Sequence, residues 1–162
     1  MGKNIELTAS DGHKFQAYVA EPSGKPRGAL VVVMEIFGVN SHIKQVADGF
    51  AADGYLAIAS ALFERVQRSV DLGYTPEDIA KGRDIRAKVP TDGALKDTEA
   101  AIKAASGAGK VGIVGYCWGG LIAWLAAGKL GGLSAAAPYY GGGILDNAEL
   151  EPKVPVMAHF GD

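Results

Sequence analysis

The sequence predicts an α/β fold, in which a mostly parallel sheet carries helices on both faces. Strand-like apolar runs alternate with segments of helical periodicity along the 162 residues, and this alternation implies right-handed crossovers between parallel strands. The exception lies at the N-terminus, where Asp11-Gly12 joins two short runs at residues 5–9 and 14–22. Because Asp-Gly is a strong turn signal, we expect these two runs to form an antiparallel hairpin.

Residues 29–34 carry the next element, the continuous apolar run A-L-V-V-V-M. Such a run, rich in β-branched side chains, is typical of a strand that is buried on both faces. A helix is expected after it, capped by Asn40 or Ser41 and ending near Ala52. Residues 55–63 then favour a second buried strand.

The rest of the chain continues the same alternation. Residues 64–75 are mixed and polar, which favours a loop. The segment T-P-E-D at residues 75–78 opens a helix, because it offers a capping side chain, a proline at the first position and early acids. The remaining elements follow in order: a helix over residues 91–105, a strand over 110–115, a helix over 118–129, a strand over 133–140 and a last strand over 154–160.

The composition indicates an ordinary globular protein. Hydrophobic residues make up 48% and charged residues 21% of the chain, and a net charge of −2 favours neither nucleic acid nor an anionic membrane as a partner. No signal peptide is expected, because the N-terminus lacks a basic segment followed by an apolar core. No apolar run approaches the roughly 20 residues that a membrane-spanning helix needs. We therefore expect a cytoplasmic protein.

Neither a metal nor an organic cofactor is expected. The single cysteine excludes an internal disulfide, and the sequence has no Cys/His cluster at zinc spacing. Residues 107–112 match the dinucleotide-binding pattern G-x-G-x-x-G, but that pattern must follow a strand and open a helix. Here it ends a predicted helix and precedes a strand, so a helix-stop loop is the better interpretation.

The single cysteine, Cys117, lies in a motif typical of catalytic nucleophiles. Residues 115–119, G-Y-C-W-G, fit the pattern G-x-nucleophile-x-G, with a β-branched strand before them and a helix after them. In such a turn the nucleophile takes a strained backbone conformation, and the flanking glycines avoid clashes. The N–H groups at the start of the following helix favour a thiolate. The alternative interpretation is a buried, inert cysteine in a tight turn.

A second segment predicts a catalytic site at the same edge of the sheet. Residues 34–40, M-E-I-F-G-V-N, follow the central strand, where an α/β-hydrolase takes its second oxyanion-hole N–H. The first would be the backbone N–H of Trp118, directly after the nucleophile. Glu35 is an acid at the end of a buried strand, which is costly without a partner. A solvated strand-end carboxylate is the alternative interpretation of Glu35.

These motifs resemble those of the dienelactone hydrolases, also called carboxymethylenebutenolidases. The resemblance is carried by E-I-F-G-V-N at residues 35–40 together with G-Y-C-W-G-G at residues 115–120. Residues 139–141, Y-Y-G, and the predicted strand ending in H-F-G at residues 159–161 are similar to that family as well. The resemblance covers nearly all of the chain.

The resemblance implies an α/β-hydrolase fold and a catalytic site. It implies that Cys117 is the nucleophile and that the N–H groups of Ile36 and Trp118 form the oxyanion hole. In that family, the glutamate that matches Glu35 interacts with the thiol at rest. It takes part in the activation of the thiol when substrate binds.

The chain departs from the family pattern near its end. The family's triad acid lies three residues beyond the H-F-G glycine, whereas Asp162 is one residue beyond Gly161 and is the last residue of the sequence. None of the three histidines, His13, His42 and His159, follows the acid as a triad base must. We therefore expect residues 1–162 to be a single α/β-hydrolase domain that is incomplete at its C-terminus. Its last strand and helices, the acid and the base would lie beyond residue 162.

Two arginines are candidates for binding substrate. Family members that cleave dienelactone hold its carboxylate with arginines, and Arg83 and Arg86 lie in the matching region, three apart on a predicted helix. Neither falls on the family arginine's own position, which Ile79 occupies. A solvated basic face is the alternative interpretation of both side chains.

The sequence therefore predicts a hydrolase that cleaves an ester or lactone, a small-molecule substrate, through a cysteine nucleophile and an acyl-thioester intermediate. A broader carboxylesterase or thioesterase is the first alternative. The second is a noncatalytic α/β binding module that keeps the cysteine turn for structural reasons.

Overall fold

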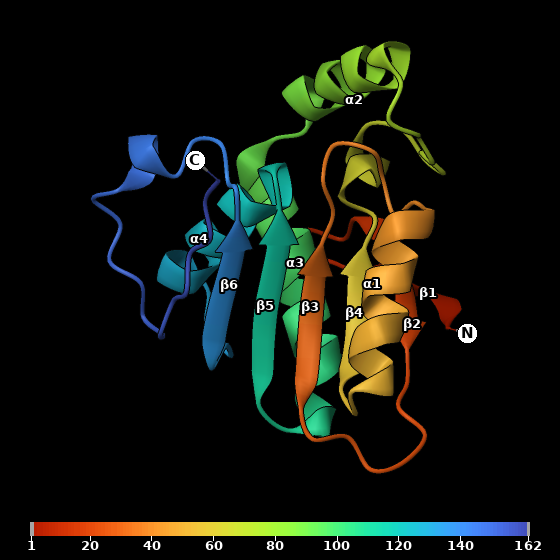
Figure 1. The fold of residues 1–162 in the computed structure, drawn as a ribbon, viewed down its shortest axis with the longest axis vertical. Coiled ribbons are helices and arrows are strands. Elements are labelled where there is room, and N and C mark those ends of the chain that lie inside the picture. The colour runs from red at the N-terminus through yellow and green to blue at the C-terminus, as the bar shows by residue number, and fades with distance from the viewer. Residues whose placement is uncertain (1, 162) are drawn as a thin grey trace.

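Six strands form one sheet in the computed structural model, which describes residues 2–161 (Figure 1). They are β1 (Lys3–Thr8), β2 (Lys14–Ala20), β3 (Ala29–Val33), β4 (Leu56–Ser60), β5 (Val111–Tyr116) and β6 (Ala135–Tyr139). Their order across the sheet is β1-β2-β4-β3-β5-β6. β1 pairs antiparallel with β2, and β2 with β4, while the other neighbours are parallel. The predicted hairpin and mostly parallel sheet are confirmed.

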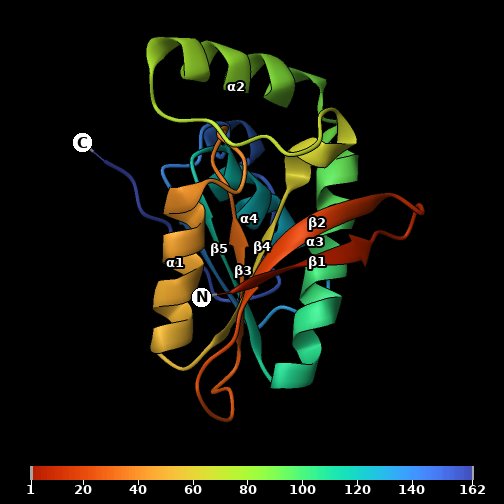
Figure 2. The same ribbon diagram turned by 90° about the vertical axis from the view of Figure 1, so that its right-hand side faces the viewer.

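Helices cover both faces of this sheet. The α-helices are α1 (Ser41–Ala52), α2 (Pro76–Lys88), α3 (Thr91–Ala105) and α4 (Trp118–Lys129), and the short 3₁₀ turns are η1 (Leu62–Arg65), η2 (Ser106–Ala108) and η3 (Leu145–Asn147). α1 lies on one face and α3, which packs against α4, on the other, while α2 lies across the carboxyl ends of the strands (Figure 2). None of the helices in the described residues is long and apolar enough to cross a membrane.

The helix starts follow from local side-chain chemistry. Of the two candidate caps for α1, the structure uses Asn40, whose side chain accepts a hydrogen bond from the N–H of Ile43 at 3.2 Å. For α2, the hydroxyl of Thr75 accepts from the N–H of Asp78, and the Asp78 carboxylate accepts in return from the N–H of Thr75. Each cap satisfies backbone N–H groups that have no partner inside the helix.

The central strand β3 brings the site segments to one edge. Its residues Val31, Val32 and Val33 are at most 1% exposed, and burial of such a side chain contributes about 1.5–3 kcal/mol. In the parallel register, Val33 of β3 lies opposite Gly115 of β5. The residues that follow these two strands therefore emerge side by side at the carboxyl edge of the sheet.

The apolar stretch predicted as a strand over residues 55–63 is split in two. The strand β4 ends at Ser60, and η1 follows it as a tight turn, with the N–H of Glu64 donating to the carbonyl of Ala61 at 3.0 Å. Phe63, in this turn, is buried because its ring stacks on Trp118 at a centroid distance of 5.6 Å. Burial of its side chain therefore reflects a contact with the start of α4 rather than a place in the sheet.

The strand predicted over residues 154–160 forms only two isolated bridges to β6, between Ala136 and Val156 and between Tyr139 and His159. The cause is Pro138 in the middle of β6, which has no N–H to donate to the neighbouring segment. Hydrogen bonds form before and after it, from Met157 N to Ala136 O at 3.0 Å and from His159 N to Pro138 O at 2.9 Å. The segment therefore follows β6 without completing a ladder.

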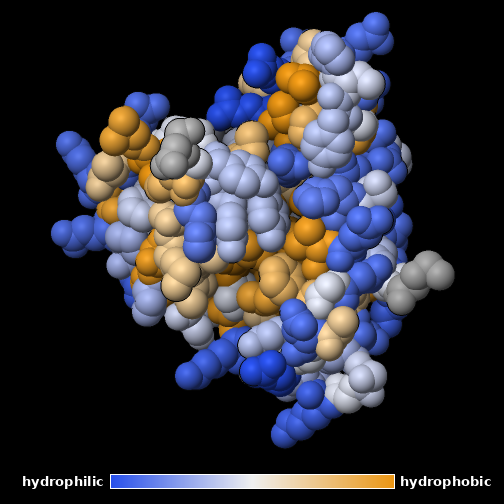
Figure 3. Space-filling view, viewed as in Figure 1, coloured by the Kyte–Doolittle hydropathy of each residue, from blue (hydrophilic) through white to orange (hydrophobic). Residues whose placement is uncertain are grey.

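Part of the sheet is open on the side where α1 lies. Figure 3 shows apolar surface in the middle of this face, and an apolar groove with a volume of about 440 Å³ lies there. Its lining comes from β3, α1, β5, β6 and residues 155–157.

Candidate active site

Cys117 forms the tight turn between β5 and α4 in a backbone conformation that residues other than glycine rarely adopt. Its φ is 56° and its ψ is −119°. The turn is held by the N–H of Cys117, which donates to the carbonyl of Tyr139 at 3.0 Å, and by the N–H of Gly120, which donates to the carbonyl of Cys117 at 2.9 Å. The residue is partly exposed. Strain of this kind costs on the order of 1–3 kcal/mol and concentrates at functional sites.

The glycines two residues before and after Cys117 are required by close backbone approach. A Cβ atom on Gly115 would overlap the carbonyl oxygen of Gly119. A Cβ atom on Gly119 would overlap the carbonyl oxygen of Val33, in the central strand. The spacing of the motif therefore follows from a turn that folds back on itself and presses against β3.

Ile36 and Trp118, the two expected oxyanion-hole donors, lie beyond the ends of β3 and β5. Trp118 is the first residue of α4, so its N–H has no acceptor inside the helix. Ile36 lies just beyond β3, opposite the cysteine turn in the sheet register. Within residues 2–161, neither N–H donates to another group of the protein. The indole of Trp118 is buried against Phe63.

Glu35 lies two residues beyond the end of β3 and is partly exposed. Its Oε2 accepts a hydrogen bond from the hydroxyl of Tyr74 at 2.9 Å. Its charge also reaches the other side of the cysteine turn: burial raises the pKa of Tyr140 to about 12, and the carboxylate of Glu35 adds to that rise. The interaction between Glu35 and the thiol that the family resemblance implies stays a prediction.

Tyr140 and Tyr74 extend the site beyond the residues that sequence reasoning selected. Tyr140 has a φ of 39°, its ring is half exposed, and its N–H donates to the carbonyl of His159 at 2.7 Å. The run of three glycines after it is a sequence signal for such a tight turn. Tyr74 lies one residue before the cap of α2, and no local pattern distinguishes it from an ordinary loop residue.

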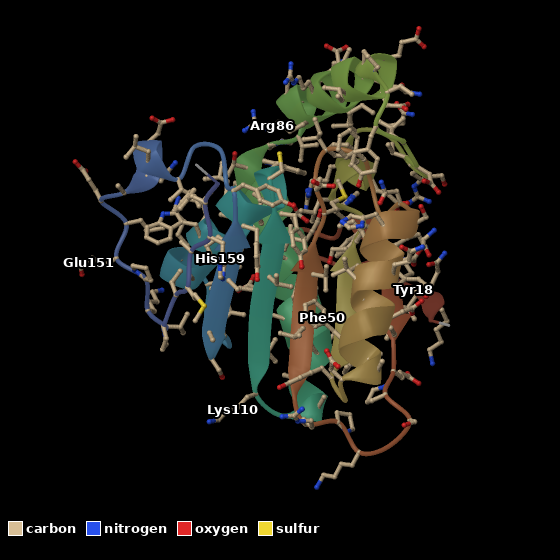
Figure 4. All side chains as sticks on the ribbon, in the orientation of Figure 1. Tyr18, Phe50, Arg86, Lys110, Glu151 and His159 are labelled. Atoms are coloured by element: carbon tan, nitrogen blue, oxygen red, sulfur yellow. The ribbon has the colours of Figure 1, made fainter. Side chains whose placement is uncertain are left out.

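The histidines lie in three separate places. His13 is in the hairpin, with its Nε2 3.9 Å from Asp97 Oδ2, and His42 is at the start of α1. His159 stacks on Tyr139 at 4.3 Å with the rings 8° apart, and Figure 4 shows it beside β6. It thereby supports the carbonyl that holds the N–H of Cys117. Asp162 lies outside the described residues.

Arg83 and Arg86 are both exposed on α2, and neither forms an ion pair within the described residues. Figure 4 places Arg86 at the end of α2 that leads into α3. The helix packs through Gly82 and Ile85, which are buried. Arg86 lies one turn after Gly82 and therefore at the border of this packed face. A role for the two arginines in binding substrate stays a proposal, with a solvated face as the alternative.

No cluster of three or more His, Cys, Asp or Glu residues able to hold a metal ion occurs within residues 2–161.

Comparison with known sequences gives consistent matches. A family model described as "Dienelactone hydrolase family" matches residues 15–162. The carboxymethylenebutenolidase of Pseudomonas putida is 34% identical over 169 residues, which cover 98% of this chain and 70% of the relative. A carboxymethylenebutenolidase candidate from Synechocystis sp. is 41% identical over 137 residues, which cover 81% of this chain and 55% of that relative. The chain thus spans about half the length of several curated relatives.

Solved structures match in the same way. The crystal structure of a dienelactone hydrolase candidate from Klebsiella pneumoniae subsp. pneumoniae is similar at a TM-score of 0.70 and 34% identity, over 86% of this chain and 60% of that chain. An α/β serine hydrolase homologue from Coxiella burnetii is similar at a TM-score of 0.68 and 12% identity, over 99% of this chain and 74% of that chain. The second likeness concerns the fold alone. The predicted α/β-hydrolase fold is confirmed.

Proposed function

The chain belongs to the dienelactone hydrolase family, and from this we propose that the protein hydrolyses an ester or lactone through the thiol of Cys117. The observation that carries the proposal is the strained φ of 56° at Cys117, in a turn whose glycine spacing is fixed by backbone contact. If this position served only to form the turn, a glycine would adopt the positive φ without strain. A cysteine in this strained conformation therefore favours a chemical role for its side chain.

The reaction proceeds in two steps. In the first, the Cys117 thiol loses its proton, the thiolate attacks the carbonyl carbon and a C–S bond forms. The C–O bond to the alcohol breaks, and the alcohol leaves with the proton that the thiol lost. In the second, water attacks the acyl-thioester, the C–S bond breaks, and the acid and the thiol are released. In a lactone the alcohol and the acid are two ends of the same product.

The oxyanion that develops in each step is stabilised by backbone donors. The N–H of Ile36 is supplied by the β3–α1 loop, and the N–H of Trp118 by the start of α4, directly after the nucleophile. Glu35, next to Ile36, disfavours the thiolate while the site is empty and takes part in the activation of the thiol when substrate binds. Such donors, fixed in the fold before substrate arrives, need no rearrangement when the charge appears.

The experiment is to trap the covalent intermediate. Full-length protein is mixed with p-nitrophenyl acetate, quenched in acid within the first turnovers, and digested for mass spectrometry. An acetyl group on the peptide that contains Cys117, absent when the sample is left to turn over fully, is the expected result. Rapid ester turnover with acetylation at another residue would overturn the assignment.

A broader carboxylesterase is the second candidate. The family arginine that holds the carboxylate of dienelactone corresponds to Ile79 in this chain, on α2 and partly exposed. An apolar side chain at that position favours substrates without a carboxylate. Comparison of turnover for dienelactone and for neutral aryl esters distinguishes the two candidates.

A further inference from the structure

The carboxylate of Glu35 is tied to the segment that leads into α2, through its hydrogen bond from the Tyr74 hydroxyl at 2.9 Å. Within residues 2–161 this is the one side-chain hydrogen bond that the carboxylate makes. Glu35 stands directly before Ile36, one of the two proposed oxyanion donors. The hydrogen bond from Tyr74 therefore helps to set where the Glu35 carboxylate lies relative to the thiol.

The segment that carries Tyr74 is fastened to the β3–α1 loop along its length. Asp71 forms an antiparallel bridge with Gly38. The N–H of Leu72 donates to the carbonyl of Phe37 at 2.9 Å, and the side-chain amide of Asn40 donates to the carbonyl of Leu72 at 3.1 Å. The backbone that carries Tyr74 is thus fixed by hydrogen bonds that do not involve the Tyr74 hydroxyl.

The ring of Tyr74 is fixed by contacts that do not involve its hydroxyl. It packs on Phe37 at a centroid distance of 4.5 Å and lies edge-on to His42 at 6.4 Å. A phenylalanine would keep both contacts. Removal of the hydroxyl alone therefore removes its hydrogen bond to Glu35 and its interaction with the Asn40 side chain, while the ring keeps its contacts.

α2 contacts the same loop a second time. It begins one residue after Thr75, and its Gly82 packs so closely on Ile36 that a Cβ atom would overlap the Ile36 carbonyl. Tyr74 and Gly82 thus join the helix to two consecutive residues of the site, Glu35 and Ile36.

The negative charge of Glu35 acts on the side chains of Tyr116, at the end of β5, and Tyr140, directly after β6. Burial raises the pKa of Tyr116 and of Tyr140, and the Glu35 carboxylate contributes to both rises. Tyr116 directly precedes Cys117, and the carbonyl of Tyr139, next to Tyr140, accepts from the N–H of Cys117. The parallel register gives the same placement, because Glu35 and Cys117 each lie two residues beyond the paired residues Val33 and Gly115, at one edge of the sheet. A carboxylate beside a thiol opposes its ionisation, and more strongly as it approaches the sulfur.

We propose that Tyr74 is a positioning residue that holds the Glu35 carboxylate on the α2 side of the site and thereby limits how strongly its charge opposes ionisation of the Cys117 thiol. The proposal rests on the proposed function only in taking Cys117 as the reactive group. It makes the start of α2 part of the control of thiol reactivity.

The test is the pH profile of Cys117 alkylation by iodoacetamide in the full-length protein, followed by mass spectrometry of the Cys117 peptide. The variants are Tyr74→Phe, Glu35→Gln and the double variant. The matched control is Tyr18→Phe, because the Tyr18 hydroxyl also donates to a carboxylate, that of Asp48 at 2.8 Å, in the contact between β2 and α1.

Tyr74→Phe frees the carboxylate to approach the sulfur, so the profile should move to higher pH by roughly 0.5–1 unit, with alkylation at pH 7 slowed about 3- to 10-fold. Glu35→Gln should move the profile to lower pH, the double variant should match Glu35→Gln, and Tyr18→Phe should match the parent protein. A Tyr74→Phe profile that coincides with the parent, or a shift that persists without the Glu35 charge, would overturn the proposal. Because alkylation is independent of ester turnover, these results stand even if Cys117→Ala retains activity and the proposed function fails.

Discussion

Arg65, the last residue of η1, forms a buried bidentate ion pair with Asp97 of α3. Arg65 Nε lies 2.9 Å from Asp97 Oδ2, and Arg65 Nη2 lies 2.7 Å from Asp97 Oδ1. The side chain of Asp97 is fully buried and that of Arg65 is 13% exposed. Burial raises the pKa of the Asp97 carboxyl, while Arg65 acts in the opposite direction. The pair anchors η1, and through the Phe63–Trp118 stack it supports the start of α4.

Arg65→Met should lower the free energy of unfolding by about 3–5 kcal/mol, because it leaves a buried carboxylate without its partner. The measurement is urea denaturation at pH 7. Lys88→Met is the matched control, because Lys88 pairs with Asp84 at 3.7 Å where both side chains are exposed. Such a surface pair contributes about 0.5 kcal/mol. Equal costs for the two variants would contradict the role assigned to Arg65.

Asp11 should make the stability of the protein depend on pH. The side-chain hydrogen bonds from Arg65 are the largest cause that lowers the pKa of Asp11, from its ordinary 3.8 to about 2. A carboxylate with a lowered pKa in the folded state stabilises the fold above its unfolded pKa, and this contribution is lost as the pH falls through the folded value. Asp11→Asn should therefore be less stable than the parent at pH 6, and the gap should narrow below pH of about 4. Thermal melts across this range measure the gap, and a gap that stays constant would contradict the assignment.

Cys117→Ala should abolish turnover of an activated ester while the protein keeps its fold, because the alanine lacks the nucleophile but preserves the turn's size. Cys117→Ser should keep little activity. The pKa of a hydroxyl lies far above the pKa of a free thiol, which is about 8.5, so the serine needs a stronger base. Circular dichroism serves as the control for folding. Unchanged turnover by Cys117→Ala would remove the thiol from the mechanism.

Two helical glycines should respond in opposite ways to a methyl group. At Gly82 a Cβ atom meets the Ile36 carbonyl, so Gly82→Ala should push α2 from the loop, destabilise the protein by about 1–3 kcal/mol and lower ester turnover. At Gly49, in α1, a Cβ atom meets open space, so Gly49→Ala should stabilise by about 0.5–1 kcal/mol through helix propensity, with turnover unchanged. Denaturation and turnover are measured on both variants. Loss of turnover in Gly49→Ala with turnover kept in Gly82→Ala would contradict the role assigned to the contact between Gly82 and Ile36.

The local rules of the sequence predicted the elements that depend on local chemistry. The bounds of α3 and α4 and the cap of α2 agree with the structure, because caps, proline and glycine act within a few residues. The turn at Cys117 was also predictable, because the residues that form it, G-Y-C-W-G, are five consecutive positions of the sequence.

The remainder depends on contacts between distant segments. Tyr74 and Glu35 are 39 residues apart, and Arg65 and Asp97 are 32 apart, so no local pattern marks either pair. The prediction of a last strand over residues 154–160 considered that segment alone. It was wrong because a ladder needs donors on both sides, and the missing donor belongs to Pro138, in its neighbour.

Pro138 also determines how the sheet edge opens. Two separate sets of hydrogen bonds fasten residues 154–160 to β6, one around Ala136 and one around His159. The carbonyl of Pro138 belongs to the second set, but Pro138 has no N–H to donate between the two sets. Local opening of one set therefore leaves the other intact, and the amides of Met157 and His159 should exchange with solvent hydrogen at independent rates. Fluctuations that expose the apolar groove beside Met157 can thus occur while His159 still holds Tyr139 and Tyr140 against the cysteine turn.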